Sequence, residues 1–168
     1  MTDQSAGVSE REALARLRSI GEEIVDGVER CLPAWVECRV RDLLDAWGRL
    51  DEPVRRRAET DATAAGTHAA ARVAGQLRDL FALDPAEQRV TPLEVVRSAV
   101  REPTEVLRSV GVPPVVRDAF DERTVPDDVY GLTPRTLGDL GDESLAPLHL
   151  AWGLAKAAVL RSRAERQP

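Results

Sequence analysis

Apolar residues recur every three or four positions over long stretches of the first half of the chain, and this spacing restricts the fold more than any other feature. Ser9 and Glu12 have the pattern of a capping box at a helix start. The apolar positions that follow are Leu14, Leu17, Ile20, Ile24, Val28 and Cys31. Such a period places apolar side chains on one face of an α-helix, whereas a strand would need strict alternation. The sequence therefore predicts a first amphipathic helix over residues 9–31.

A second apolar series begins after Pro33, a residue type that is favoured in the first turn of a helix. Its spacing alternates between four and three residues, the a/d pattern of a coiled-coil seam. The residues of this seam are Val36, Val40, Leu43, Trp47 and Leu50. Two arrangements are compatible with the pattern: a new helix that starts at Pro33, or one continuous helix that kinks there.

A third segment opens with Asp51 as a cap and Pro53 in the first turn, and continues to Leu83. Its stripe begins with small residues and ends with large ones: Ala58, Ala62, Ala65, Ala69, Val73, Leu77 and Leu80. Alanines let another helix approach closely. We expect this face to lie against one of the two preceding helices or against a copy of itself, with residues 60–67, which include Gly66, as its weakest part.

The second half of the chain, after Asp84-Pro85, is punctuated by prolines and predicts short helices. It contains one internal repeat, in which Pro-Leu-Glu-Val-Val-Arg-Ser at 92–98 is followed by Pro-Thr-Glu-Val-Leu-Arg-Ser at 103–109. Each copy places a proline in the first turn behind a Thr91 or Glu102 cap, and each has a Glu and an Arg three residues apart. We therefore expect two similar short helices.

Further short elements follow the repeat. A helix is expected from Val112-Pro113-Pro114 to Phe120, a loop over 121–130, and a helical turn from Thr133-Pro134 to Leu140 that Gly141 ends. The last helix, over residues 144–163, is apolar on nearly every side. A helix of this kind is normally buried, so we expect it at the centre of the C-terminal half.

Composition supports an all-α fold. Of 168 residues, 43% are hydrophobic but only 4% are aromatic, so the core must consist mainly of Leu, Val and Ala. We expect a frayed arm over residues 1–8 and three antiparallel helices over 9–83, whose long members form a bundle or a hairpin. A compact cluster of short helices over 84–168 should surround the buried terminal helix. The connection near Asp84 is short, so the two halves are expected to form one structural unit.

Charge and hydropathy exclude several classes of protein. The net charge of -6 makes nucleic acid an improbable partner, although the triplet Arg55, Arg56 and Arg57 keeps that alternative open. The most apolar stretch, residues 145–160, is shorter than the roughly 20 residues that span a bilayer. No secretory or mitochondrial presequence pattern occurs at the N-terminus. We therefore expect a cytoplasmic protein without membrane contact, with Cys31 and Cys38 as reduced thiols.

Residues that could carry chemistry are few. His149 and Lys156 lie in the last helix, and with Arg97, Arg108 and the pair Asp127-Asp128 they could line a pocket among the C-terminal helices. A second acidic set could offer oxygen ligands to a divalent cation: Asp118, Asp121, Glu122, Asp127 and Asp128. It lacks the glycine and the spacing of an EF-hand loop, and neither histidine has a helical metal-ligand partner. We expect no metal and no cofactor.

The stretch from Thr91 through Val-Tyr-Gly-Leu-Thr-Pro at 129–134 to Trp152 resembles part of a group of short, uncharacterised proteins of high-GC bacteria. The resemblance covers roughly the C-terminal half. It contains no motif of known chemistry and assigns no functional residue.

The absence of convergent catalytic motifs in the sequence favours a non-enzymatic interaction module, an adaptor or regulator that pairs with another protein or with itself through its long helices. The expected partner surface is the seam of the second helix: Trp35, Val36, Val40, Leu43, Trp47 and Leu50. Trp35 lies off the main seam and would be the first hot-spot candidate if exposed. A small enzyme or ligand-binding protein is the first alternative, and a nucleic-acid-associated factor is the second.

Overall fold

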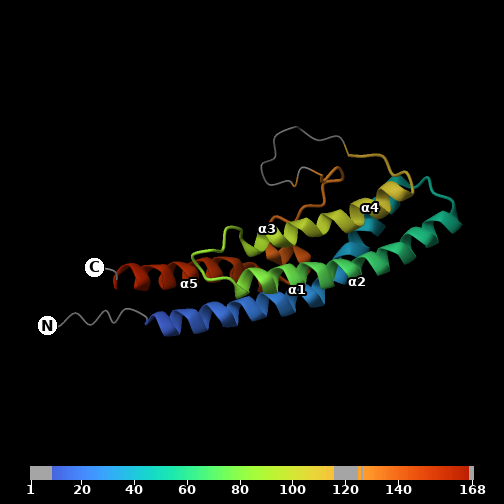
Figure 1. The fold of residues 1–168 in the computed structure, drawn as a ribbon. Helices are drawn as coiled ribbons and strands as arrows, with labels where there is room; N and C mark the ends of the chain where they lie inside the picture. Colours follow the sequence, from blue (N-terminus) through green and yellow to red (C-terminus); the bar gives the residue numbers. More distant parts are fainter. Residues whose placement is uncertain (1–8, 116–124, 126, 167–168) are drawn as a thin grey trace.

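Two long antiparallel helices, α1 (Glu10–Trp47) and α2 (Glu52–Ala82), form the main body of the protein (Figure 1). The computed structural model describes residues 9–115, 125 and 127–166, and within these residues all regular secondary structure is helical. The predicted all-α fold is therefore confirmed. The Ser9 capping box with Glu12 is also present, with the Glu12 amide donating to the Ser9 hydroxyl at 3.3 Å.

Pro33 lies inside α1, a continuous helix of 38 residues. The expectation of three N-terminal helices is therefore wrong, and the alternative of one continuous helix is confirmed. A proline in a helix interior removes the hydrogen bond to the carbonyl four residues back. Leu32 and Val36, on either side of it, are fully buried, and their packing against the rest of the core holds the two parts of α1 in one helix.

The alanine face of α2 packs against α1, as one of the two alternatives predicted. The two backbones come close at Gly66, which is buried: a Cβ atom at this position would lie 2.7 Å from the carbonyl oxygen of Pro33. Glycine is therefore required here by the separation of the two backbones. This close contact lies in the part of α2 that looked weakest in the sequence.

The next helical segment comprises α3 (Pro92–Arg97), a 3-10 turn η1 (Ser98–Val100) and α4 (Arg101–Ser109), which follow one another directly. The predicted Thr91 cap of the first copy is confirmed, because Thr91 and Glu94 form a capping box. The predicted pair of Glu94 with Arg97 is not formed, since Arg97 donates to the carbonyl of Pro134. The hydroxyls of Ser98 and Ser109 occupy equivalent places, and each donates to the carbonyl three residues back, at 2.6 and 2.7 Å.

The second copy differs from the prediction. Glu102 is not a cap, because η1 continues the helical path into α4 and places this residue within a helical turn. Its buried carboxylate accepts two hydrogen bonds from Arg72 of α2, at 2.7 and 2.9 Å, and so fastens α4 to α2. Glu105 pairs with Arg101 at 3.1 Å, and not with Arg108 as the repeat suggested.

The C-terminal part contains the 3-10 turns η2 (Leu137–Leu140) and η3 (Glu143–Leu145) and the helix α5 (Ala146–Ala164). Gly141 ends η2 with a left-handed φ of 104°, as predicted. The predicted turn begins at residue 137, later than expected from Thr133-Pro134. Residues 112–115, at the start of the helix expected to end at Phe120, are not helical. Residues 116–120 of that helix, half of the loop 121–130 and the arm 1–8 lie outside the described residues.

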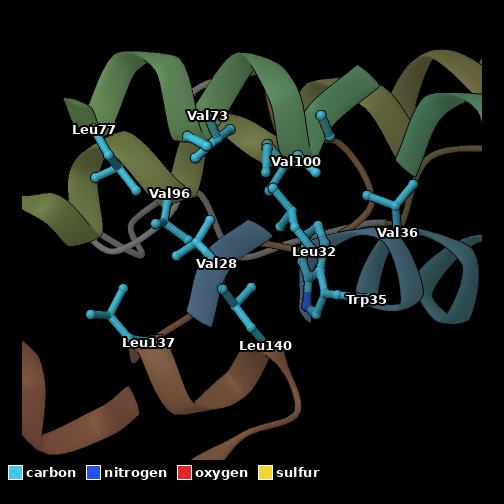
Figure 2. Close-up of a cluster of buried hydrophobic side chains, with 14 of the residues drawn as sticks. Val28, Leu32, Trp35, Val36, Val73, Leu77, Val96, Val100, Leu137 and Leu140 are labelled. Atoms are coloured by element: carbon cyan, nitrogen blue, oxygen red, sulfur yellow. The ribbon is translucent and has the colours of Figure 1, made fainter. Parts of the chain in front are cut away.

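The buried core joins both halves of the chain. Figure 2 shows Val28 and Leu32 of α1 between Val73 and Leu77 of α2 on one side and the 3-10 turn η2 on the other. The further labelled residues of this cluster are Trp35, Val36, Val96, Val100, Leu137 and Leu140. The seam at residues 36–50 and the alanine stripe thus contribute to one intramolecular core.

The helix α5 was found where the sequence predicted it, but the expectation that it is buried on all sides is wrong. Only Trp152, Ala155 and Val159 of α5 are buried. The elements that pack against α5 are α1, η2 and η3, whereas α3 and α4 lie on the α1–α2 hairpin (Figure 1). The outward face of α5, with Leu150 and Leu154, is therefore not covered by any described element. Among the described residues, no helix has the length and apolar character that a membrane span requires.

Candidate interaction surface

The helix α5 is fixed to α1 at both ends by ion pairs. At its start, Arg30 of α1 donates to Asp142 at 2.9 Å, and Asp142 also accepts from the amide of Ser144 at 3.0 Å. These hydrogen bonds, first from Ser144 and then from Arg30, hold the pKa of Asp142 below its ordinary value. At the other end, Arg163 donates to Glu10 of α1 at 2.8 Å. The orientation of α5 is therefore defined by contacts at both of its ends.

The middle of α5 is fixed by Lys156. Its ammonium group donates to the backbone carbonyl of Gln88 at 2.7 Å and lies 5.1 Å from the ring centre of Trp152. Burial, and secondarily the charge of Arg89, lowers the pKa of Lys156. These contacts are those of a lysine that ties the 83–91 connection to α5 through a hydrogen bond and a cation–π contact.

The outward face of α5 carries an exposed apolar stripe. Leu150 is 67% exposed and Leu154 is 60% exposed, the two highest values among the exposed large apolar residues of the described chain. Pro147 and Ala157, one turn further out on each side, are also exposed. The spacing of these four residues is three, four and three, so they lie along one line of the helix surface. We call these four residues the α5 stripe.

Opposite charges stand at the two ends of the α5 stripe. Glu143 precedes it by four residues and Arg161 follows it by four residues, and both side chains are exposed. Glu143 lies two positions before the buried Leu145, on the opposite side of the helical path. The surface thus consists of an apolar centre with an acidic end and a basic end, which is suited to binding another helix and offers no reactive group.

The partner surface predicted from the sequence is largely occupied within the chain. Trp35 is only 5% exposed, and Val36 and Val40 are fully buried. Leu43, Trp47 and Leu50 are half-buried and pack against the same core. The prediction of this seam as a docking surface is therefore wrong, because α2, α4 and η2 already fill it.

The residues expected to line a C-terminal pocket do not converge. Arg97 donates to the carbonyl of Pro134 at 3.2 Å. The buried Asp128 accepts from the amides of Leu132 and Thr133 at 2.9 and 2.8 Å and thus organises its own loop. The remaining candidates are also dispersed: Arg108 and Asp127 are exposed, while His149 and Lys156 are half-buried on α5.

A cleft of about 860 Å³ lies elsewhere, between the N-terminal half of α1, the end of α2 and the end of α5. Its apolar lining includes Leu14, Leu17, Val25 and Phe81. Two of its arginines are already neutralised, since Arg163 pairs with Glu10 and Asp84 and Arg78 pairs with Glu29. None of the residues around it is a Ser, Thr, Cys, His or Lys. The cleft has the size to admit a small apolar molecule but contains no nucleophile paired with a base.

The acidic set and the arginine triplet also lack the arrangement that their proposed roles need. No group of three or more potential metal ligands occurs among the residues described, and Asp118, Asp121 and Glu122 lie outside them. Arg55 pairs with Asp45 and Glu59, and Arg56 pairs with Glu52 at 3.1 Å. Two of the three arginines are therefore already paired with carboxylates, which oppose binding of a phosphate backbone.

Comparisons with protein-family models, with curated proteins and with solved structures gave no match to this chain. Function must therefore be argued from the molecule itself. The sequence interpretation missed the α5 stripe because all apolar residues of residues 144–163 were assigned to the core. A signal was present: residues 145, 148, 152, 155 and 159 form one seam, and residues 147, 150, 154 and 157 form a second seam on the opposite side.

Proposed function

We propose that this protein is a non-enzymatic helical interaction module, an adaptor or regulator, whose docking surface is the α5 stripe. The observation that carries the proposal is the exposure of Leu150 and Leu154, one turn apart, on a helix that is fixed at both ends. A rigid, pre-positioned apolar helix face loses little conformational entropy when a partner helix binds it.

The partner surface differs from the one that the sequence suggested, but the class of function is the same. The long helices α1 and α2 supply the scaffold, and the shorter α5 presents the surface. An isolated exposed leucine is ordinary on a protein surface. Two leucines one turn apart, extended by Pro147 and Ala157 and bounded by opposite charges, form a continuous strip of the kind that binds a second helix.

The proposal is tested by purifying tagged protein from its native host as wild type and as the Leu150→Glu and Leu154→Glu variants. Val54→Glu is the matched control, because Val54 is an exposed apolar residue in the first turn of α2, outside the α5 stripe. We expect a stoichiometric bound chain, either a second copy or another protein, with wild type and Val54→Glu, and its loss with both leucine variants. A bound chain that persists in both leucine variants overturns the proposal. A wild-type protein that neither retains a bound chain in purification nor self-associates at high concentration also overturns it.

A further inference from the structure

We propose that the partner of the α5 stripe is a second copy of this chain, bound antiparallel across a two-fold axis that passes at the level of Trp152. The inference rests on the proposed function and specifies the partner of the same surface. It follows from the positions of six residues along η3 and α5, the four of the α5 stripe with Glu143 and Arg161, and from the charges of the last two.

The α5 stripe is symmetric about position 152. Leu150 and Leu154 lie two positions on either side of it, and Pro147 and Ala157 lie five positions on either side. In an antiparallel pair of helices related by a two-fold axis, residues equally distant from the axis face each other. Leu150 of each copy therefore contacts Leu154 of the other, and Pro147 of each copy contacts Ala157 of the other, so each contact occurs two times in the dimer. Large residues oppose large ones at the centre, and small or compact residues oppose each other outside.

The charges select the antiparallel orientation. Glu143 and Arg161 lie nine positions on either side of Trp152, so each acidic end faces a basic end in the antiparallel pair. A parallel pair would place Glu143 against Glu143 and Arg161 against Arg161, which is repulsive. Neither side chain forms an ion pair with another described residue of its own chain, so both are available to a partner.

The backbone also permits close approach near the axis. Gly153 lies beside the α5 stripe, and no atom lies within 4 Å of the position that its Cβ would occupy. In the antiparallel register it faces Ala151, another small residue. Small residues at a helix crossing let the two backbones approach, which improves the packing of the leucines beside them.

The strength of the contact follows from the size of α5. Its 19 residues extend about 28 Å, and one pair of such helices buries an area at or below the lower limit of stable interfaces, on the order of 1,000 Å² in total. We therefore expect a reversible dimer with a dissociation constant on the order of micromolar. It should be populated at high protein concentration and should dissociate on dilution.

The experiment is sedimentation equilibrium of the purified full chain over a concentration series, with wild type, Leu154→Glu, Glu143→Arg, Arg161→Glu and the double variant Glu143→Arg/Arg161→Glu. Val54→Glu serves again as the control. We expect a concentration-dependent dimer for wild type and Val54→Glu, and at least a hundredfold weakening for Leu154→Glu, because two buried carboxylates would face the apolar centre. Each single charge reversal should weaken the dimer about tenfold, since both symmetric pairs become repulsive, and the double variant should restore it.

Each other result overturns the inference in a recognisable way. A wild-type dimer that survives Leu154→Glu places the self-contact elsewhere and overturns the inference, while the proposed function is then decided by the native-host purification. A dimer lost in Leu154→Glu but not restored by the double variant has a different register. A monomer at all concentrations removes self-association. The proposed function then still stands if the native-host purification yields another protein that both leucine variants lose, and it falls if no chain is bound.

Discussion

Replacing Gly66 with alanine tests how the α1–α2 hairpin is held together. In a helix interior, glycine to alanine alone stabilises the folded state by about 1 kcal/mol, because alanine restricts the unfolded chain and favours helix. At position 66, however, the added Cβ would lie 2.7 Å from the carbonyl oxygen and 3.0 Å from the Cα of Pro33. These are backbone atoms of the neighbouring helix and cannot rotate away as a side chain could.

The two effects have opposite signs, and the steric effect is larger. Forcing a methyl group into a filled contact costs about 1–3 kcal/mol, and we take the upper end because α1 itself must shift. Gly66→Ala should therefore lower the free energy of unfolding by about 2 kcal/mol. Gly75 is the matched control, since it lies in the same helix and no atom lies within 4 Å of the place of its Cβ. Gly75→Ala should raise the free energy of unfolding by about 1 kcal/mol.

The assay is urea unfolding followed by far-ultraviolet circular dichroism at one protein concentration, with thermal unfolding as a second measurement. We expect the two variants to differ by about 3 kcal/mol at an unchanged denaturant slope, and by roughly 6–12 °C in Tm for a chain of this size. A Gly66→Ala protein that is as stable as wild type would refute the reasoning, because α1 and α2 would then not be in contact at Pro33.

Three further predictions concern the buried ion pair, the acid sensitivity and the tryptophans. Glu102→Gln breaks the buried pair with Arg72 and should lower the free energy of unfolding by about 3 kcal/mol. Glu105→Gln breaks the exposed pair with Arg101 in the same helix and should lower it by less than about 1 kcal/mol. Equal losses of the two variants in urea unfolding would contradict this. The pKa of Asp142 is lower in the folded chain than in the unfolded chain, so this carboxylate stabilises the fold fully above its unfolded pKa and loses that effect as pH falls through its folded pKa. Asp142→Asn should therefore flatten the acid limb of a plot of unfolding free energy against pH. An unchanged acid limb would argue against the Arg30 and Ser144 contacts. Acrylamide should quench mainly the fluorescence of Trp47, which is half-buried. In Trp47→Phe the remaining fluorescence comes from the buried Trp35 and Trp152 and should be quenched only weakly. Strong quenching in that variant would contradict the burial of these two tryptophans.

Helical periodicity was enough to predict most of the individual helices. The positions of Leu17, Ile20 and Ile24 on one face are a local property, and local spacing fixes which side chains share a helix face. The same pattern could not decide whether α1 breaks at Pro33. That outcome depends on burial of Leu32 and Val36 by α2 and η2, which is a property of the folded chain and not of the local sequence.

The partner surface was predicted wrongly for a related physical reason. An a/d seam such as Val36, Val40 and Leu43 shows that a helix face needs a neighbour, but not whether that neighbour is in the same chain. Here the alanine face of α2, together with α4 and η2, supplies it. The opposite error was made for α5, where apolar character on two sides was interpreted as burial on both, although the helices of the chain that could cover it pack elsewhere.

The charges at the ends of the α5 stripe have a simpler explanation that must be separated from self-pairing. An acidic residue near a helix start and a basic residue near its end both interact favourably with the helix dipole. If Glu143 and Arg161 served only this purpose, reversing either would change the stability of a single chain equally at every protein concentration. Self-pairing instead makes the effect of each reversal depend on concentration and disappear on dilution, because only the dimer contains the contact. It also makes the double reversal favourable again, whereas the dipole explanation makes it the least stable variant of all. The two explanations thus predict opposite orders for the single and the double variants, and the sign of that difference decides between them.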